Sequence, residues 1–356
     1  KIKPDYVDAF NNLGVIYHDI HEFQKAINSY EKAIEINPNF IVAHNNLGAV
    51  FFALGDHKKT INCYKKAIEI DPNHELSLYN LGVAQYSCNQ FKNAAEQFRL
   101  SNFKNSKSFL LNCFYKLDDE FSFFEELDNQ IKQGKTNAII GSLTSRSEIK
   151  YGIKKPNLFC EDPLKYVLKT DLTEQYNFKD VFVNPIKDFL KEEVFPSRQQ
   201  NLLTNGQQTA GNLFSVKNDY LKNIEDIIHI EVNKYRDHFK DSNEGFLKKW
   251  PTNYYIKGWL VNMKNGGSLA PHMHETGWLS GSIYINVPPK SKVDSGNLVV
   301  CIDDKENEAK IKIDTKKIIN VVTGSLCLFP SSLHHYTVPF ESKEDRIVLA
   351  FDVTPS

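Results

Sequence analysis

A spacing of 34 residues that repeats through the N-terminal third of the chain constrains its fold more than any other feature. The tripeptide Asn12-Leu13-Gly14 recurs 34 and 68 residues later, and Pro4 recurs at the same intervals. Beginning with Tyr30, an aromatic residue recurs at the same interval of 34 residues. A small residue lies four positions before each of these aromatic residues. A fixed period of this length is typical of stacked helical pairs, in which each pair buries its apolar face against its neighbours.

These recurring positions resemble tetratricopeptide repeats over about residues 4–106. The resemblance implies an all-α solenoid in which the small residue lies where two helices cross and proline ends the second helix. The third repeat departs from the pattern at Ser101 and Ser106, while residues 109–133 keep helical patterning. We therefore assign residues 1–134 to a repeat solenoid whose degenerate last helix pair caps the stack.

The charge balance of the chain argues against binding through a general electrostatic field. Lys and Arg number 43, Asp and Glu number 44, and the formal net charge is -1. No apolar run approaches the roughly 20 residues of a spanning helix. We therefore expect neither a nucleic-acid nor a membrane partner.

The six cysteines are scattered without the short spacings of a structural zinc site or a disulfide framework. This distribution favours a reducing compartment, and we expect a cytoplasmic protein. Because the sequence begins with Lys1 rather than Met, a signal peptide removed during maturation stays an open alternative.

Residues 135–249 show a mixed pattern, which we interpret as a helical and irregular connector that supports the domain after it. Helices are expected near residues 137–151, 184–193 and 219–240. The polar, turn-rich residues 207–212 fit either a loop over a pocket or a plain connector, and we favour the connector.

From Trp250 onward, β-branched and aromatic runs are separated by Gly, Asn and Pro. Seven short strands expected in residues 250–356 predict a β-sandwich or barrel there. We expect the chain as a whole to be a multidomain α + β protein. The expected strands are residues 254–263, 279–287, 297–302, 309–313, 318–322, 325–329 and 346–353.

Four of the eleven histidines gather in two clusters of this β region. His272 and His274 are two residues apart, so on a strand both imidazoles point to the same face and can approach one point. His334 and His335 form the second cluster. Neutral imidazole suits iron, zinc, copper or nickel, so the clusters indicate a metal site. Arg346, on the next strand, would present the planar fork that binds a carboxylate.

The segments around these residues resemble the 2-oxoglutarate/Fe(II) oxygenases of bacteria that carry N-terminal tetratricopeptide repeats. The resemblance implies a double-stranded β-helix (jelly roll) with flanking helices, and the use of Fe(II), 2-oxoglutarate and O2 to hydroxylate a C–H bond. It rests on Gly-Trp-Leu-Val-Asn-Met at 258–263, His-Met-His-Glu-Thr-Gly-Trp-Leu-Ser-Gly at 272–281, Leu-Phe-Pro-Ser-Ser-Leu-His-His-Tyr-Thr-Val-Pro-Phe at 328–340 and Arg-Ile-Val-Leu-Ala-Phe-Asp-Val at 346–353.

Carried over position by position, the resemblance implies that His272 and His335 are iron ligands. It implies that Arg346 pairs with the distal carboxylate of 2-oxoglutarate. Tyr284 would donate a hydrogen bond to the same carboxylate, and Ser282, which shares its strand face, is a weaker candidate for this contact.

The sequence departs from the usual ligand set, which is His-x-Asp/Glu with a distant His, because His274 stands at the position of the carboxylate. Three alternatives stay open for the third ligand: His274 itself, Glu275 across a bulge, or water. Trp278 is a candidate for the pocket wall, although a place in the barrel core is the stronger expectation.

We therefore expect a 2-oxoglutarate- and Fe(II)-dependent hydroxylase whose repeats recruit a protein or peptide substrate through their groove. A cupin-like metal protein is one alternative, but the sequence lacks the cupin glutamate after His274 and this reading leaves Arg346 without a role. The other alternative is a non-catalytic repeat scaffold with a degenerate oxygenase domain, which the missing carboxylate favours.

Overall fold

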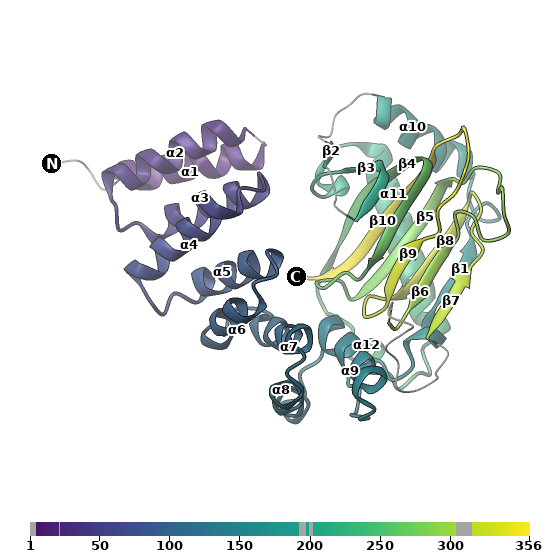
Figure 1. Ribbon diagram of the computed structural model, residues 1–356. Coiled ribbons are helices and arrows are strands. Elements are labelled where there is room, and N and C mark those ends of the chain that lie inside the picture. Colours follow the sequence, from purple (N-terminus) through teal and green to yellow (C-terminus); the bar gives the residue numbers. More distant parts are fainter. Residues whose placement is uncertain (1–4, 21, 192–196, 199–201, 304–314) are drawn as a thin grey trace. The chain divides into compact units, whose positions relative to one another are not determined.

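The chain folds into two compact units, Lys1–Asp128 and Asn129–Ser356, and each is described by itself (Figure 1). The computed structural model describes residues 5–20, 22–191, 197–198, 202–303 and 315–356. The strand expected at 309–313 lies outside these residues. Within the described ranges, no helix is both long and apolar enough to cross a membrane.

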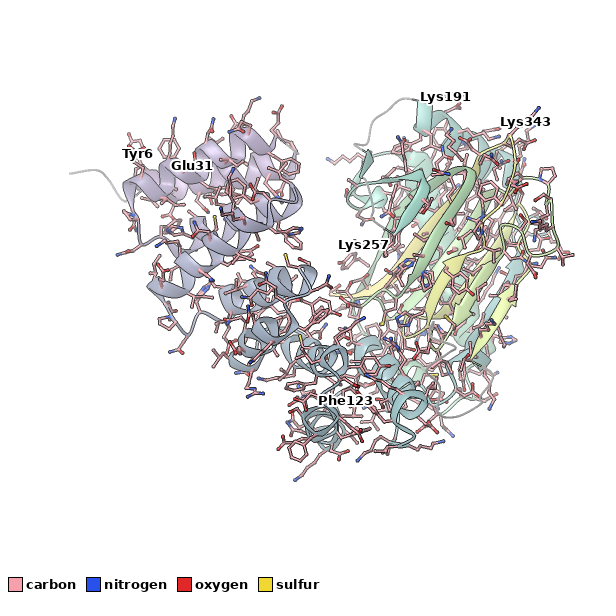
Figure 2. All side chains as sticks on the ribbon, in the orientation of Figure 1. Tyr6, Glu31, Phe123, Lys191, Lys257 and Lys343 are labelled. Atoms are coloured by element: carbon pink, nitrogen blue, oxygen red, sulfur yellow. The ribbon has the colours of Figure 1, made fainter. Side chains whose placement is uncertain are left out.

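The first unit consists of helices that pair in sequence order, as the repeat predicts. In the second pair, a Cβ atom added to Gly48 would lie 2.6 Å from the ring of Tyr64, so the aromatic ring fills the space that the glycine leaves. Side chains such as Tyr6 and Glu31 are exposed along these helices (Figure 2). The helices are α1 (Asp5–Asp19), α2 (Phe23–Ile36), α3 (Ile41–Ala53), α4 (His57–Ile70), α5 (Glu75–Ser87), α6 (Phe91–Leu100), α7 (Ser106–Leu117) and α8 (Glu120–Lys132). The last two lie where the degenerate pair was expected, and α8 continues past Asp128, the last residue of this unit.

The second unit contains the three helices expected before the β region, and a largely antiparallel β-structure. The helices are α9 (Ala138–Tyr151), α10 (Asn184–Lys191), α11 (Asp219–His238) and the short α12 (Gly245–Lys248). The strands are β1 (Leu168–Asp171), β2 (Ser197–Arg198), β3 (Leu203–Thr209), β4 (Tyr254–His272), β5 (Leu279–Asn286), β6 (Leu298–Cys301), β7 (Lys316–Ile319), β8 (Ser325–Pro330), β9 (His334–Thr337) and β10 (Arg346–Pro355).

The strands pair antiparallel in the order β1-β8-β5-β10-β4-β9-β6-β7, and β3 also pairs with β4. Strand β4 is 19 residues long. Its first half pairs with β10 and its end pairs with β9, so one strand takes part in both halves of the sheet. This barrel-like arrangement is consistent with a jelly roll, and the predicted fold class is confirmed (Figure 1).

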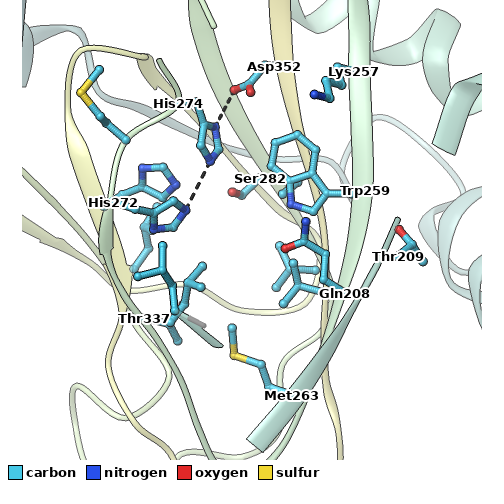
Figure 3. Close-up of a pocket in the computed structure, with 18 of the residues that line it drawn as sticks. Gln208, Thr209, Lys257, Trp259, Met263, His272, His274, Ser282, Thr337 and Asp352 are labelled. Atoms are coloured by element: carbon cyan, nitrogen blue, oxygen red, sulfur yellow. Dashed lines mark hydrogen bonds and ion pairs between the residues drawn. The ribbon is translucent and has the colours of Figure 1, made fainter. Parts of the chain in front are cut away.

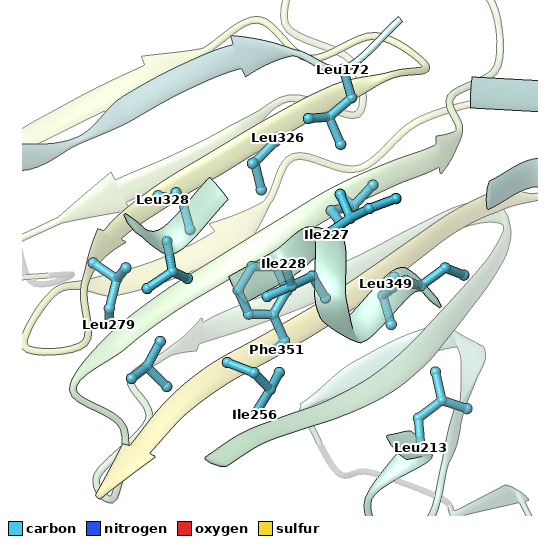
Figure 4. Packing of buried hydrophobic residues seen from close by; sticks show 14 of the residues in the cluster. Leu172, Leu213, Ile227, Ile228, Ile256, Leu279, Leu326, Leu328, Leu349 and Phe351 are labelled. Carbon is cyan, nitrogen blue, oxygen red and sulfur yellow. The ribbon is translucent and has the colours of Figure 1, made fainter. Parts of the chain in front are cut away.

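Side chains along β10 alternate between a hydrophobic core and a cavity. Leu349 and Phe351 pack in the core with Ile227 and Ile228 of α11 (Figure 4). The Phe351 ring fits because its register partner on β5 is Gly281, where an added Cβ would lie 2.2 Å from the ring. The intervening residues of β10 line the cavity described below.

We expect Gly281→Ala to lower the free energy of unfolding of this unit by roughly 1–3 kcal/mol, because the added methyl group overpacks the core. Urea unfolding followed by tryptophan fluorescence measures this, since all three tryptophans lie in the second unit. Adding Phe351→Leu to the Gly281→Ala chain should recover part of the loss. A wild-type unfolding midpoint for Gly281→Ala alone would contradict the packing.

Candidate metal centre

A cavity of about 450 Å³ lies on the inner face of strands β4, β5 and β10 (Figure 3). Residues that pair across these strands face the cavity in rows, one of which is Ser282, Ala350 and Trp259. Strands β3 and β9 contribute further lining residues. A volume in the range of about 300–1,000 Å³ is ordinary for a site that binds a small molecule.

Three histidines meet at one end of this cavity. His272 ends β4 and pairs in register with His335 on β9, and their ring centres are 4.3 Å apart. His274 lies two residues beyond His272, and its ring centre is 4.7 Å from that of His335. One ring nitrogen of each histidine lies within 4.8 Å of the others. The backbone therefore brings three possible metal ligands together from two strands and the turn that follows β4.

Hydrogen bonds orient two of these rings. Nδ1 of His272 lies 2.9 Å from the carbonyl oxygen of Ala270, which can only accept, so Nδ1 carries the proton. Nδ1 of His274 lies 2.7 Å from Oδ1 of Asp352, and in a neutral imidazole donation to this carboxylate leaves Nε2 with its lone pair free.

The Nε2 atoms of His272 and His274 are 3.3 Å apart, and with this proton arrangement neither can donate to the other (Figure 3). A cation that accepts both lone pairs fits between them. Imidazole–metal bonds of about 2.0–2.1 Å, as zinc forms, place two nitrogens on one ion roughly 3 Å apart. The histidines present therefore fit a divalent metal ion.

The surroundings keep two of the rings in the metal-binding form. Burial, with the neighbouring imidazole of His274, lowers the pKa of His272 to about 4. Burial, with the neighbouring imidazoles of His272 and His274, lowers the pKa of His335 well below its ordinary value. Both rings are therefore neutral at pH 7, as a metal ligand must be.

A buried arginine lines the same cavity. The Arg346 side chain is 1% exposed, its Nε donates to the carbonyl oxygen of Gly296 over 3.2 Å, and its guanidinium lies 5.1 Å from the ring centre of Tyr284. Among the residues that the structure describes, no carboxylate forms an ion pair with it. Burial also raises the pKa of Tyr284, which keeps its hydroxyl protonated as a donor. An unpaired buried cation is unfavourable, so this position suits an anionic ligand.

Two residues singled out from the sequence lie away from the cavity wall. Glu275 sits in a turn closed by a hydrogen bond of 3.1 Å from the Gly277 N–H to the His274 carbonyl, and it is not part of the histidine cluster. Trp278 packs in the hydrophobic core and donates its Nε1–H to the Phe246 carbonyl over 2.7 Å, so the core expectation for it holds. The other site residues predicted from the sequence all line the cavity: His272, His274, His335, Arg346, Tyr284 and Ser282. Their roles as ligands stay predictions.

The expectation that residues 207–212 are a plain connector is wrong. Their first part belongs to β3, which pairs with β4, and Gln208 and Thr209 line the cavity (Figure 3). Asp352 and Trp259 also line it and were not singled out. Counting in twos along the strand from Arg346 would have placed Asp352 on the same face.

Comparison with known proteins agrees with this arrangement. Residues 257–352 match the family described as "Putative 2OG-Fe(II) oxygenase". Residues 7–40, 41–74 and 63–97 match tetratricopeptide-repeat families. The chain thus carries tetratricopeptide repeats in its N-terminal part and a 2OG-Fe(II) oxygenase domain in its C-terminal part, as predicted.

Two solved structures are similar to parts of the chain. The tetratricopeptide-repeat domain of Sgt2 from Aspergillus fumigatus is 23% identical, with a TM-score of 0.31, and the match covers 33% of this chain and 82% of that one. A prolyl-4-hydroxylase from Pseudomonas putida is 12% identical, with a TM-score of 0.40, and the match covers 55% of this chain and 96% of that one. No curated protein matches the chain significantly.

The histidine pKa values predict that the metal-free second unit loses stability in acid. The ordinary value is 6.5 and the folded value of His272 is about 4, so between these the unfolded chain binds more protons and stability falls as the pH falls. Each histidine contributes a slope of at most about 1.4 kcal/mol per pH unit.

Urea unfolding in the presence of a chelator at pH 7, 6 and 5 measures this effect. Because other groups also titrate, the informative quantity is the free energy of unfolding of the wild type minus that of His272→Gln. This difference should fall from pH 7 to pH 5, because only the wild type has the low pKa of His272. Parallel losses of stability in the two proteins would contradict the neutral state of His272 in the folded protein.

Proposed function

We propose that this chain is a 2-oxoglutarate- and Fe(II)-dependent dioxygenase that hydroxylates a C–H bond of a protein or peptide substrate. The observation that carries the proposal is one cavity that holds three histidines fit for a metal ion and a buried arginine that pairs with no carboxylate of the described residues. The family match over residues 257–352 supports the same chemistry. When bound, Fe(II) with 2-oxoglutarate and O2 supplies the oxidising power that protein side chains lack.

In this proposal, His272, His274 and His335 hold the iron through neutral imidazole nitrogens. Arg346 binds the distal carboxylate of 2-oxoglutarate through its planar fork. Tyr284 donates its phenol proton to the same carboxylate, and Ser282 offers a further hydroxyl beside it. These contacts orient the cosubstrate, and the buried apolar strand residues around it exclude water.

The two regions that precede the oxygenase core have separate proposed roles. We assign residues 1–134 to substrate recruitment, because tetratricopeptide repeats generally mediate protein–protein contact. Residues 135–249 would support the oxygenase core at 250–356, since α11 packs against its strands. The six free thiols support a reducing compartment, and we propose the cytoplasm.

We expect Fe(II)-dependent formation of succinate from 2-oxoglutarate by the wild-type protein. Arg346→Gln should weaken 2-oxoglutarate binding at least about 10-fold, because it removes a charge-assisted contact of roughly 1.5–3 kcal/mol. Anaerobic titration, followed by the visible absorption of the Fe(II)–2-oxoglutarate complex, measures this binding.

Lys257→Gln is the matched control, since it removes an exposed positive charge from the same cavity without touching the proposed anion site (Figure 2). It should bind 2-oxoglutarate like the wild type. Equal binding by Arg346→Gln would refute the proposed role of Arg346. A wild type with neither the absorption band nor succinate formation would favour the cupin-like or scaffold alternative.

A further inference from the structure

A buried carboxylate stands directly behind one of the three histidines. Asp352 on β10 is 4% exposed, and its Oδ1 lies 2.7 Å from Nδ1 of His274. The same oxygen accepts a hydrogen bond of 2.8 Å from the hydroxyl of Ser280. Ser280 lies 2.8 Å from the hydroxyl of Ser331, which therefore donates to Ser280. These donors hold the carboxylate oxygen at one point toward the imidazole.

The backbone also fixes His274 over this carboxylate. The turn that follows His274 closes at Gly277, where an added Cβ would lie 2.6 Å from the Ser331 hydroxyl and 3.1 Å from the Asp352 carboxyl group. Only glycine allows this approach without a shift of the neighbours. The indole of Trp259 meets the His274 ring edge-on, with ring centres 5.1 Å apart. Three contacts thus fix the His274 ring: the turn closed by Gly277, the hydrogen bond to Asp352 and the edge-on contact with Trp259.

In the described part of the chain, one titratable side chain is in direct contact with the buried carboxylate of Asp352. Within the described residues, His274 is the ion-pairing partner of Asp352 (Figure 3). Lys257 faces Asp352 in the β4–β10 register, but its side chain is exposed and no ion pair joins the two in this part of the chain. The charge of Asp352 therefore acts through the imidazole of His274.

We propose that Asp352 is a positioning residue that fixes the Nδ1–H form of His274 and supplies, through this imidazole, the negative charge that a directly bound carboxylate would bring to the metal. The inference rests on the proposed function. An imidazole that donates to a carboxylate is a more basic metal ligand with a fixed ring orientation. His274 and Asp352 together thus replace the carboxylate ligand that the sequence lacks.

The first test compares metal affinities. Asp352→Asn keeps the shape and a carbonyl acceptor but removes the charge, and we expect it to bind Co(II) about 10- to 100-fold more weakly than the wild type in the absence of 2-oxoglutarate. Asp303→Asn is the matched control, because it neutralises a buried aspartate that pairs with Arg146 away from the cavity. The control should bind Co(II) like the wild type, and an unchanged affinity in Asp352→Asn would overturn the proposal.

The second test needs neither a variant nor a metal, so it holds even where Asp352→Asn fails to fold. Long-range ¹H–¹⁵N NMR of the metal-free wild type reports which ring nitrogen of His274 carries the proton. Protonation at Nδ1 is expected, and protonation at Nε2 would overturn the proposal. A wild type that shows Nδ1–H on His274 but binds no metal would refute the proposed function and leave the Asp352–His274 contact standing.

Discussion

The antiparallel pairing of β10 with β4 and β5 is the constraint on which both the core and the cavity depend. Because side chains alternate along a strand, this register sends Phe351 into the core and Arg346 and Asp352 into the cavity. A slip of one residue would exchange the two faces. A shift of register would place a residue with a side chain opposite Phe351 in place of Gly281, so a packing requirement in the core also positions the polar groups of the site.

The repeats and the histidine cluster could be predicted because their signals are local. A 34-residue period survives substitution at single positions, and two histidines two residues apart must share a strand face. Strand β3 was missed because its residues are mostly polar and none is fully buried, so Gln208 and Thr209 show no hydrophobic alternation. That Trp259 lines the cavity while Trp278 packs in the core depends on which way each side chain faces in the fold, and composition alone does not contain that information.

The cavity holds its two buried charges apart. Arg346 and Asp352 lie six positions apart on the same strand, which corresponds to roughly 20 Å of extended chain. Val348 and Ala350 line the wall between them. Because a salt bridge between the two is impossible at this separation, each charge needs a different partner: a hydrogen-bonded imidazole for Asp352, and for Arg346, in the proposed function, the carboxylate of 2-oxoglutarate.

The position of β10 between β4 and β5 also bears on how the two units acquire their structure. Arg346 contacts Met263 across 83 residues of chain, whereas each repeat pairs helices that are neighbours in sequence. Contacts between distant residues form slowly, because a long loop must close first. Until β10 inserts, the edges of β4 and β5 that face it have no partner, so nascent chains are most exposed to aggregation in this interval.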